Sequence, residues 1–130
     1  PVVCITGDGS FLMNGQEITV ARAESLTVIF VILNDGALGM VKHGQRLNGA
    51  EQIGAKLPSV DFSAMARAMG ITAHTIRSAD DLALLDMEAI LKRKGPTLLD
   101  VLVDPEEAPP MGVRIKVLES RSATSNLPAE

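Results

Sequence analysis

Short apolar runs alternate along the chain with segments of helical periodicity. Four apolar runs predict strands at residues 2–6, 28–33, 71–76 and 97–103. Such short runs, apolar with little polar alternation, are typical of strands buried on both faces of a parallel sheet. The segments between them predict helices within residues 10–23, 38–46, 62–69 and 80–94. This order predicts an α/β fold, a doubly wound and mostly parallel sheet with helices on both faces.

Two of these helices have recognisable end signals. Asp61 is a favourable N-cap for the helix at residues 62–69, which Gly70 ends. Ser78 and Asp81 resemble a capping box at the start of the helix at residues 80–94. That helix closes with three basic residues and then a glycine, which favours its end at Gly95.

Ligands of doubly wound sheets bind beyond the carboxyl ends of the strands. Two segments occupy such positions here: Gly7–Ser10 follows the first strand, and Asn34–Ala37 follows the second. Gly7 and Gly9 permit a tight turn and a close approach of the backbone. The helix that follows would direct unpaired backbone N–H groups into the loop. The first segment therefore predicts an anion site.

Asp8 complicates this anion site, because its carboxylate would repel a bare diphosphate. A divalent cation between the two removes the conflict. Mg²⁺ takes oxygen ligands and is commonly held by one or two carboxylates together with phosphate oxygens. Asp35, at the end of a neighbouring strand, is the natural second ligand. The pattern therefore predicts a diphosphate bound through Mg²⁺.

The same segments carry a family resemblance. Gly7-Asp8-Gly9-Ser10, with Asp35 of Asn34-Asp35 lying 27 residues after Asp8, resembles the thiamine-diphosphate motif, which begins with G-D-G and ends in a pair of asparagines. Residues 10–17 and 31–41 are similar to the large catalytic chains of acetolactate synthase and related 2-oxoacid decarboxylases. The resemblance covers roughly residues 1–104, and the first 41 are the most specific.

The resemblance implies a cofactor site for thiamine diphosphate and Mg²⁺. The implied metal ligands are Asp8, the side chain of Asp35 and the backbone carbonyl of Ala37. Gly9 and Ser10, beside Gly7, would contact the diphosphate. The ring system of the cofactor and the substrate would lie near Leu38, Gly39, Met40 and Val41. Acetolactate synthases decarboxylate a 2-oxoacid and transfer the resulting acyl carbanion to a second 2-oxoacid, whereas benzoylformate- or pyruvate-type decarboxylases stop at decarboxylation. Both reactions remain open.

The chain departs from the family pattern in two ways. Asp35 stands where the family usually has asparagine, which adds a negative charge beside the diphosphate. The resemblance also implies no catalytic residue here, because the activating glutamate belongs to another domain, usually of a partner subunit. We therefore expect a fragment whose sheet is incomplete at its N-terminal side, acting with the remaining domains of a homo-oligomeric enzyme. Acetolactate synthases often carry FAD as well, in another domain.

Composition narrows the class of protein. The chain has 130 residues, a net charge of −4, one cysteine and no Trp or Tyr, a balance that argues against a nucleic-acid partner. Its longest apolar run has six residues, against roughly 20 for a membrane-spanning helix, so no membrane partner is expected. One cysteine fits a reducing cytoplasm. We expect one cofactor-binding domain at residues 1–104 and an extended, proline-rich tail at residues 105–130.

Two other classes of protein and the roles of two histidines are the remaining alternatives. A nicotinamide-dinucleotide domain also uses glycines after its first strand, but the third glycine is missing here. A non-catalytic domain that keeps the fold for assembly is the other class. His43 follows the motif and could be an acid–base group, although a solvated loop histidine is the preferred interpretation. His74 is interpreted as structural.

Overall fold

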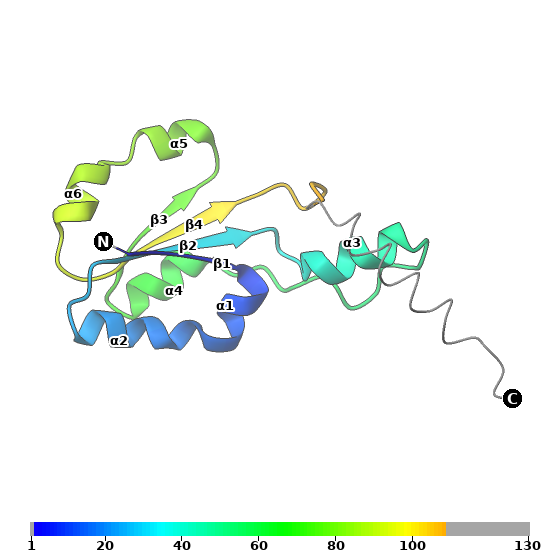
Figure 1. Ribbon diagram of the computed structural model, residues 1–130, viewed down its shortest axis with the longest axis horizontal. Coiled ribbons are helices and arrows are strands. Elements are labelled where there is room, and N and C mark those ends of the chain that lie inside the picture. The colour runs from blue at the N-terminus through cyan, green and yellow to red at the C-terminus, as the bar shows by residue number, and fades with distance from the viewer. Residues whose placement is uncertain (1, 109–130) are drawn as a thin grey trace, which may run out of the picture.

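The computed structural model describes residues 2–108, and the tail predicted at residues 105–130 therefore lies mostly outside the described residues. Four strands form one parallel sheet in the order β1-β2-β4-β3: β1 (Val2–Gly7), β2 (Val28–Asn34), β3 (Thr72–Ile76) and β4 (Thr97–Leu102). Helices lie on both faces, so the predicted α/β class with a doubly wound parallel sheet is confirmed (Figure 1).

One face of the sheet carries the larger core. It is covered by α1 (Asp8–Asn14), α2 (Ile18–Ala23) and α4 (Phe62–Ala68) (Figure 1). Phe11 and Phe62 meet there edge to face, with ring centroids 5.5 Å apart. The buried members of this core are Phe11, Ile18, Ile32, Phe62, Ala66, Ile71 and Leu98. The predicted N-cap of α4 is also confirmed, because the Asp61 carboxylate accepts a hydrogen bond from the N–H of Ala64 at 2.7 Å.

The other face is covered by α5 (Ala79–Ala83) and α6 (Met87–Lys92). We predicted one helix over residues 80–94, and this was wrong, because the chain turns between two short helices. The Ser78–Asp81 capping box is present at the start of α5. Asp86 forms a second N-cap, its carboxylate accepting from the N–H of Ala89 at 2.9 Å, and thereby starts a new helix. The segment after β1 is likewise interrupted, by a 3₁₀ turn at Gly15–Glu17.

β1 differs from the expectation that every strand is buried on both faces. Val2, Val3 and Ile5 are 61%, 55% and 66% exposed. β1 pairs only with β2 and forms an edge of the described sheet. The smaller core consists of Ile29 on β2, Leu99 on β4 and Ile90 on α6. α6 therefore covers β2 and β4 on this face and leaves β1 uncovered. No helix in residues 2–108 is long and apolar enough to cross a membrane.

Candidate functional site

The register of the sheet brings the two motif segments together. Gly7, the last residue of β1, pairs with Leu33 near the end of β2. Asp8 and Asp35 therefore leave the sheet at the same edge. The backbone N–H of Gly36 donates to Asp8 Oδ2 at 2.8 Å, so the two segments are joined directly.

Asp8 is a buried acidic group at this edge. Its residue is 4% exposed, and Oδ1 accepts from the N–H of Gly9 at 2.6 Å. Burial raises the pKa of Asp8 and the negative charge of Asp35 raises it further, while the hydrogen bonds from Gly9 and Gly36 oppose this. Among residues 2–108, neither Asp8 nor Asp35 forms an ion pair with a basic side chain.

Asp35 is held by the loop that follows it. Its Oδ1 accepts from the N–H of Ala37 at 3.0 Å. Gly36 has a φ of +65°, a left-handed conformation that glycine adopts without strain. Asn34, by contrast, turns away, because its amide donates to Asp100 Oδ1 on β4 at 2.9 Å. Asp35 rather than Asn34 is thus the side chain of this pair that is close to Asp8.

Residues 55–57, which were predicted to be loop, pair with the second motif segment. Leu38 N–H donates to the carbonyl of Ala55 at 2.7 Å, and Leu57 N–H donates to the carbonyl of Gly36 at 2.9 Å. These bonds flank an antiparallel bridge between Ala37 and Lys56. No sequence pattern marked this pairing, because it joins two irregular segments.

Glycines make room where these segments meet. A Cβ at Gly9 would lie 2.7 Å from Leu38 Cδ2, and one at Gly39 would lie 2.7 Å from Asp35 Oδ2. Neither Gly7 nor Gly9 has a positive φ, so neither position needs the left-handed conformation that glycine permits. The chain passes from extended Gly7 directly into α1, and Gly9 lets the side chain of Leu38 approach closely.

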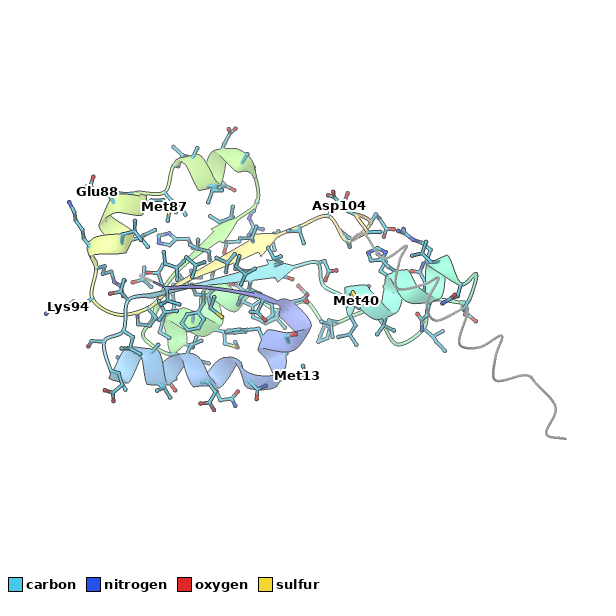
Figure 2. The ribbon with its side chains drawn as sticks, viewed as in Figure 1. Met13, Met40, Met87, Glu88, Lys94 and Asp104 are labelled. Atoms are coloured by element: carbon cyan, nitrogen blue, oxygen red, sulfur yellow. The ribbon has the colours of Figure 1, made fainter. Side chains whose placement is uncertain are left out.

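α3 (Gly39–Leu47) lies beyond the carboxyl ends of the strands, outside both helical layers (Figure 1). Met40 on this helix and Asp104 after β4 lie at the same end of the molecule (Figure 2). A cavity of about 420 Å³ lies among α3, the start of α1 and the end of β2. Its lining includes all ten residues of the predicted cofactor site: Gly7, Asp8, Gly9, Ser10, Asp35, Ala37, Leu38, Gly39, Met40 and Val41.

Four further residues line this cavity that the motif did not single out as cofactor-binding: Leu33, His43, Val103 and Glu107. His43 contradicts the interpretation as a solvated loop residue, since it lies within α3 and is 1% exposed. A helix at residues 38–46 was predicted, but its buried face depends on tertiary contacts. Val103 and Glu107 belong to the chain after β4, which carries no motif.

The segment after β4 contacts α3. Lys42 and Arg46 both form ion pairs with Glu106, and Lys42 Nζ also donates to the carbonyl of Pro105 at 2.9 Å. The hydrogen bond and charge of Lys42 hold the pKa of Glu106 below its usual range. Residues 104–108 therefore lie beside the cavity, and the rest of the predicted tail lies outside the described residues.

The residues present fit a diphosphate bound through Mg²⁺. Asp8 and Asp35, neither of which forms an ion pair among the described residues, and the carbonyl of Ala37 offer only oxygen ligands, which Mg²⁺ prefers. No group of three or more acidic, histidine or cysteine side chains that could hold a metal ion occurs within residues 2–108, and phosphate oxygens commonly complete a Mg²⁺ site of one or two carboxylates. A Cβ at Gly7 would meet nothing within 4 Å, and no side chain caps the start of α1. Space is thus available for an anion at the start of α1, where the N–H of Gly9 is bonded to Asp8 Oδ1.

Together, the parallel sheet and this cavity define an α/β domain with a glycine-rich, acidic ligand site at the carboxyl edge of its strands. The chain belongs to the family described as thiamine pyrophosphate enzyme, C-terminal TPP binding domain, whose sequence model matches residues 1–101. This establishes the resemblance on which the cofactor prediction was based.

Similar proteins and solved structures agree with the family. The probable acetolactate synthase large subunit of Methanocaldococcus jannaschii is 41% identical over 112 residues, covering 85% of this chain and 19% of that protein. The acetolactate synthase isozyme 2 large subunit of Escherichia coli is 34% identical over 128 residues, covering 93% and 23%. Benzoylformate decarboxylase from Polynucleobacter necessarius superposes with a TM-score of 0.75 at 29% identity, covering 84% and 20%. The chain thus spans about a fifth of the length of these proteins.

Proposed function

We propose that this chain supplies the thiamine diphosphate- and Mg²⁺-binding part of an acetolactate synthase-like enzyme. The observation that carries the proposal is the joining of Asp8 to the Asn34–Ala37 segment, with both carboxylates at one cavity. When bound, thiamine diphosphate supplies the carbanion stabilisation that decarboxylation of a 2-oxoacid requires. The rest of the enzyme supplies the activating glutamate, in a homo-oligomer.

In this proposal the chain's own residues bind and orient the cofactor. Asp8, Asp35 and the carbonyl of Ala37 would hold Mg²⁺, whose charge would offset the burial and the charge of Asp35 that raise the pKa of Asp8. Gly9 and Ser10, at the start of α1, face the diphosphate. The exposed apolar side chains Met40 and Val41 line the cavity and exclude water from the ring system and substrate.

A simple 2-oxoacid decarboxylase is the second candidate, and the solved benzoylformate decarboxylase supports it. Product analysis separates the two. The complete enzyme is supplied with pyruvate alone, and the products are identified. Acetolactate supports the first candidate, because it requires a second 2-oxoacid as acceptor, whereas acetaldehyde alone supports the second.

The cofactor assignment is tested by calorimetric titration of thiamine diphosphate into the complete enzyme, with and without Mg²⁺. Binding that depends on the metal supports the proposed site. Absence of binding under both conditions overturns it and favours a non-catalytic domain. Metal-independent binding of a nicotinamide dinucleotide would instead favour the dinucleotide alternative.

A further inference from the structure

His43 is a buried polar side chain without a partner. It is 1% exposed, and its Nδ1 has no hydrogen-bond partner. Within residues 2–108, no other fully buried side-chain nitrogen or oxygen atom of a non-exposed residue lacks one. Because burial without a partner forfeits the hydrogen bonds to water, such a group costs folding free energy and calls for an explanation.

The position of His43 on α3 suggests that explanation. His43 follows Gly39 by four residues and Met40 by three, so it lies on the same side of the helix as these two residues. All three line the same 420 Å³ cavity as Asp8 and Asp35. His43 is thus a buried polar residue that lines the ligand cavity.

The other polar side chains of the cavity are three carboxylates and the hydroxyl of Ser10, which the proposed function assigns to the diphosphate. Asp8, Asp35 and Glu107 are carboxylates and, when ionised, only accept hydrogen bonds. The two basic residues of α3, Lys42 and Arg46, are paired with Glu106. Among the described lining residues, His43 therefore offers the one side-chain nitrogen, beside an apolar wall that includes Leu38, Met40 and Val41.

A 2-oxoacid is complementary to this arrangement. Its carboxylate and keto oxygens accept hydrogen bonds, and its alkyl or aryl group suits the apolar wall. We infer that His43 binds the 2-oxoacid substrate by donating a hydrogen bond from Nδ1 to one of these oxygens. This inference rests on the proposed function, because it places the substrate in the cavity that the cofactor shares. The alternative oxyanion is the diphosphate of the cofactor, and separate measurements distinguish the two.

Three variants of the complete enzyme test the role of Nδ1. His43→Leu removes the polar group, His43→Asn retains an amide near the position of Nδ1, and His43→Gln places it further out. The measurements are KM and kcat for the 2-oxoacid, the Kd of oxamate in the presence of cofactor, and the Kd of thiamine diphosphate with Mg²⁺. Oxamate is an unreactive 2-oxoacid analogue and so reports binding without turnover.

For His43→Leu, we expect the KM and the oxamate Kd to rise about tenfold, the loss typical of one hydrogen bond to a charged group. His43→Asn should recover most of this loss, and His43→Gln should recover less. The Kd of thiamine diphosphate should not change. The thermal midpoint of His43→Leu should be unchanged or higher, because the variant removes an unpaired buried group.

His74→Leu is the matched control. His74 is the chain's other histidine; it lies half-buried on β3 and does not line the cavity. The same substitution there should leave the oxamate Kd and KM unchanged.

Several results would overturn the inference. An unchanged oxamate Kd and KM in His43→Leu would show that His43 does not bind substrate. A weaker Kd for thiamine diphosphate would assign the hydrogen bond to the cofactor, and a lower thermal midpoint with no rescue by asparagine would indicate a structural role. Failure of the unaltered enzyme to bind thiamine diphosphate would contradict the proposed function instead, so the two failures are distinguishable.

Discussion

Asp35 and Asp8 are two carboxylates of one small site, and the repulsion between them can be tested through the pKa of Asp8. The charge of Asp35 contributes to the raised pKa of Asp8. In Asp35→Asn, we expect the pKa of Asp8 to fall and cofactor binding to depend less steeply on Mg²⁺ concentration and pH. Carboxyl NMR titration and calorimetry at several pH values measure these changes. A variant that binds the cofactor with the same pH and metal dependence would contradict the assignment of Asp35.

The pH dependence has a definite sign. A carboxyl group whose pKa is raised by folding is destabilising in its ionised form, so the metal-free protein loses stability as pH rises through the pKa of Asp8. Mg²⁺ binding needs the ionised form, so metal affinity should rise over the same pH range.

Gly39 provides a second test at the scale of one residue. A Cβ there would lie 2.7 Å from Asp35 Oδ2 and would displace that carboxylate. We expect Gly39→Ala to weaken Mg²⁺ binding about tenfold, the scale of losses when the support of a metal ligand is disturbed. Gly44→Ala is the control, because a Cβ at this site on the same helix meets nothing within 4 Å. It should stabilise α3 by about 1 kcal/mol and leave metal affinity unchanged. Equal metal affinity in both variants would argue against a metal role for Asp35.

At the scale of elements, Asp86 separates α5 from α6. Its carboxylate caps the N–H of Ala89. Asp86→Ala should cost about 1 kcal/mol, and hydrogen exchange of residues 87–92 should become about fivefold faster. Asp80→Ala, which removes an acidic residue from the first turn of α5 without removing its cap, should have a smaller effect. Unchanged exchange in Asp86→Ala would show that other contacts determine the start of α6.

The ion pairs between α3 and the segment after β4 form a second element-scale feature. Folding lowers the pKa of Glu106, so its contribution to docking is fully present above the ordinary carboxyl range and is lost as pH falls through the lowered value. Glu106→Gln should accelerate hydrogen exchange of residues 104–107 at neutral pH, as should high salt acting on exposed charges. Glu107→Gln is the control, since Lys42 and Arg46 pair with Glu106. Equal exchange in the two variants would contradict a role for these ion pairs.

At the scale of the whole molecule, β1 presents apolar side chains and an unpaired strand edge among the described residues. Such edges pair with other chains. The chain produced alone should therefore self-associate, and Val3→Lys with Ile5→Lys should reduce the association measured by sedimentation velocity. Leu84→Lys should not, because this side chain is 84% exposed at the end of α5, which packs against β3 at the opposite edge of the sheet. If Leu84→Lys reduced association equally, the β1 edge would not be the contact.

Much of the architecture was predictable from local patterns. The four strands, the capping signals at Asp61 and Ser78, and the motif around Asp8 depend on short-range sequence, and the structure contains all of them. The second cap at Asp86 was overlooked, although an aspartate preceding an apolar helical turn is itself a local signal. The exposure of β1 was not predictable, because an apolar run does not indicate which strand lies at a sheet edge.

The residue types and their spacing were enough to predict a ligand class at this edge of the sheet, because glycines and carboxylates at a defined spacing favour a particular chemistry. How these groups meet depends on the tertiary fold. The parallel register placed Asp8 beside Gly36, the segment around Ala55 secured the second loop, and packing buried His43 against the cavity. These features depend on contacts between residues distant in the chain, and such contacts leave no periodic or local pattern in the sequence.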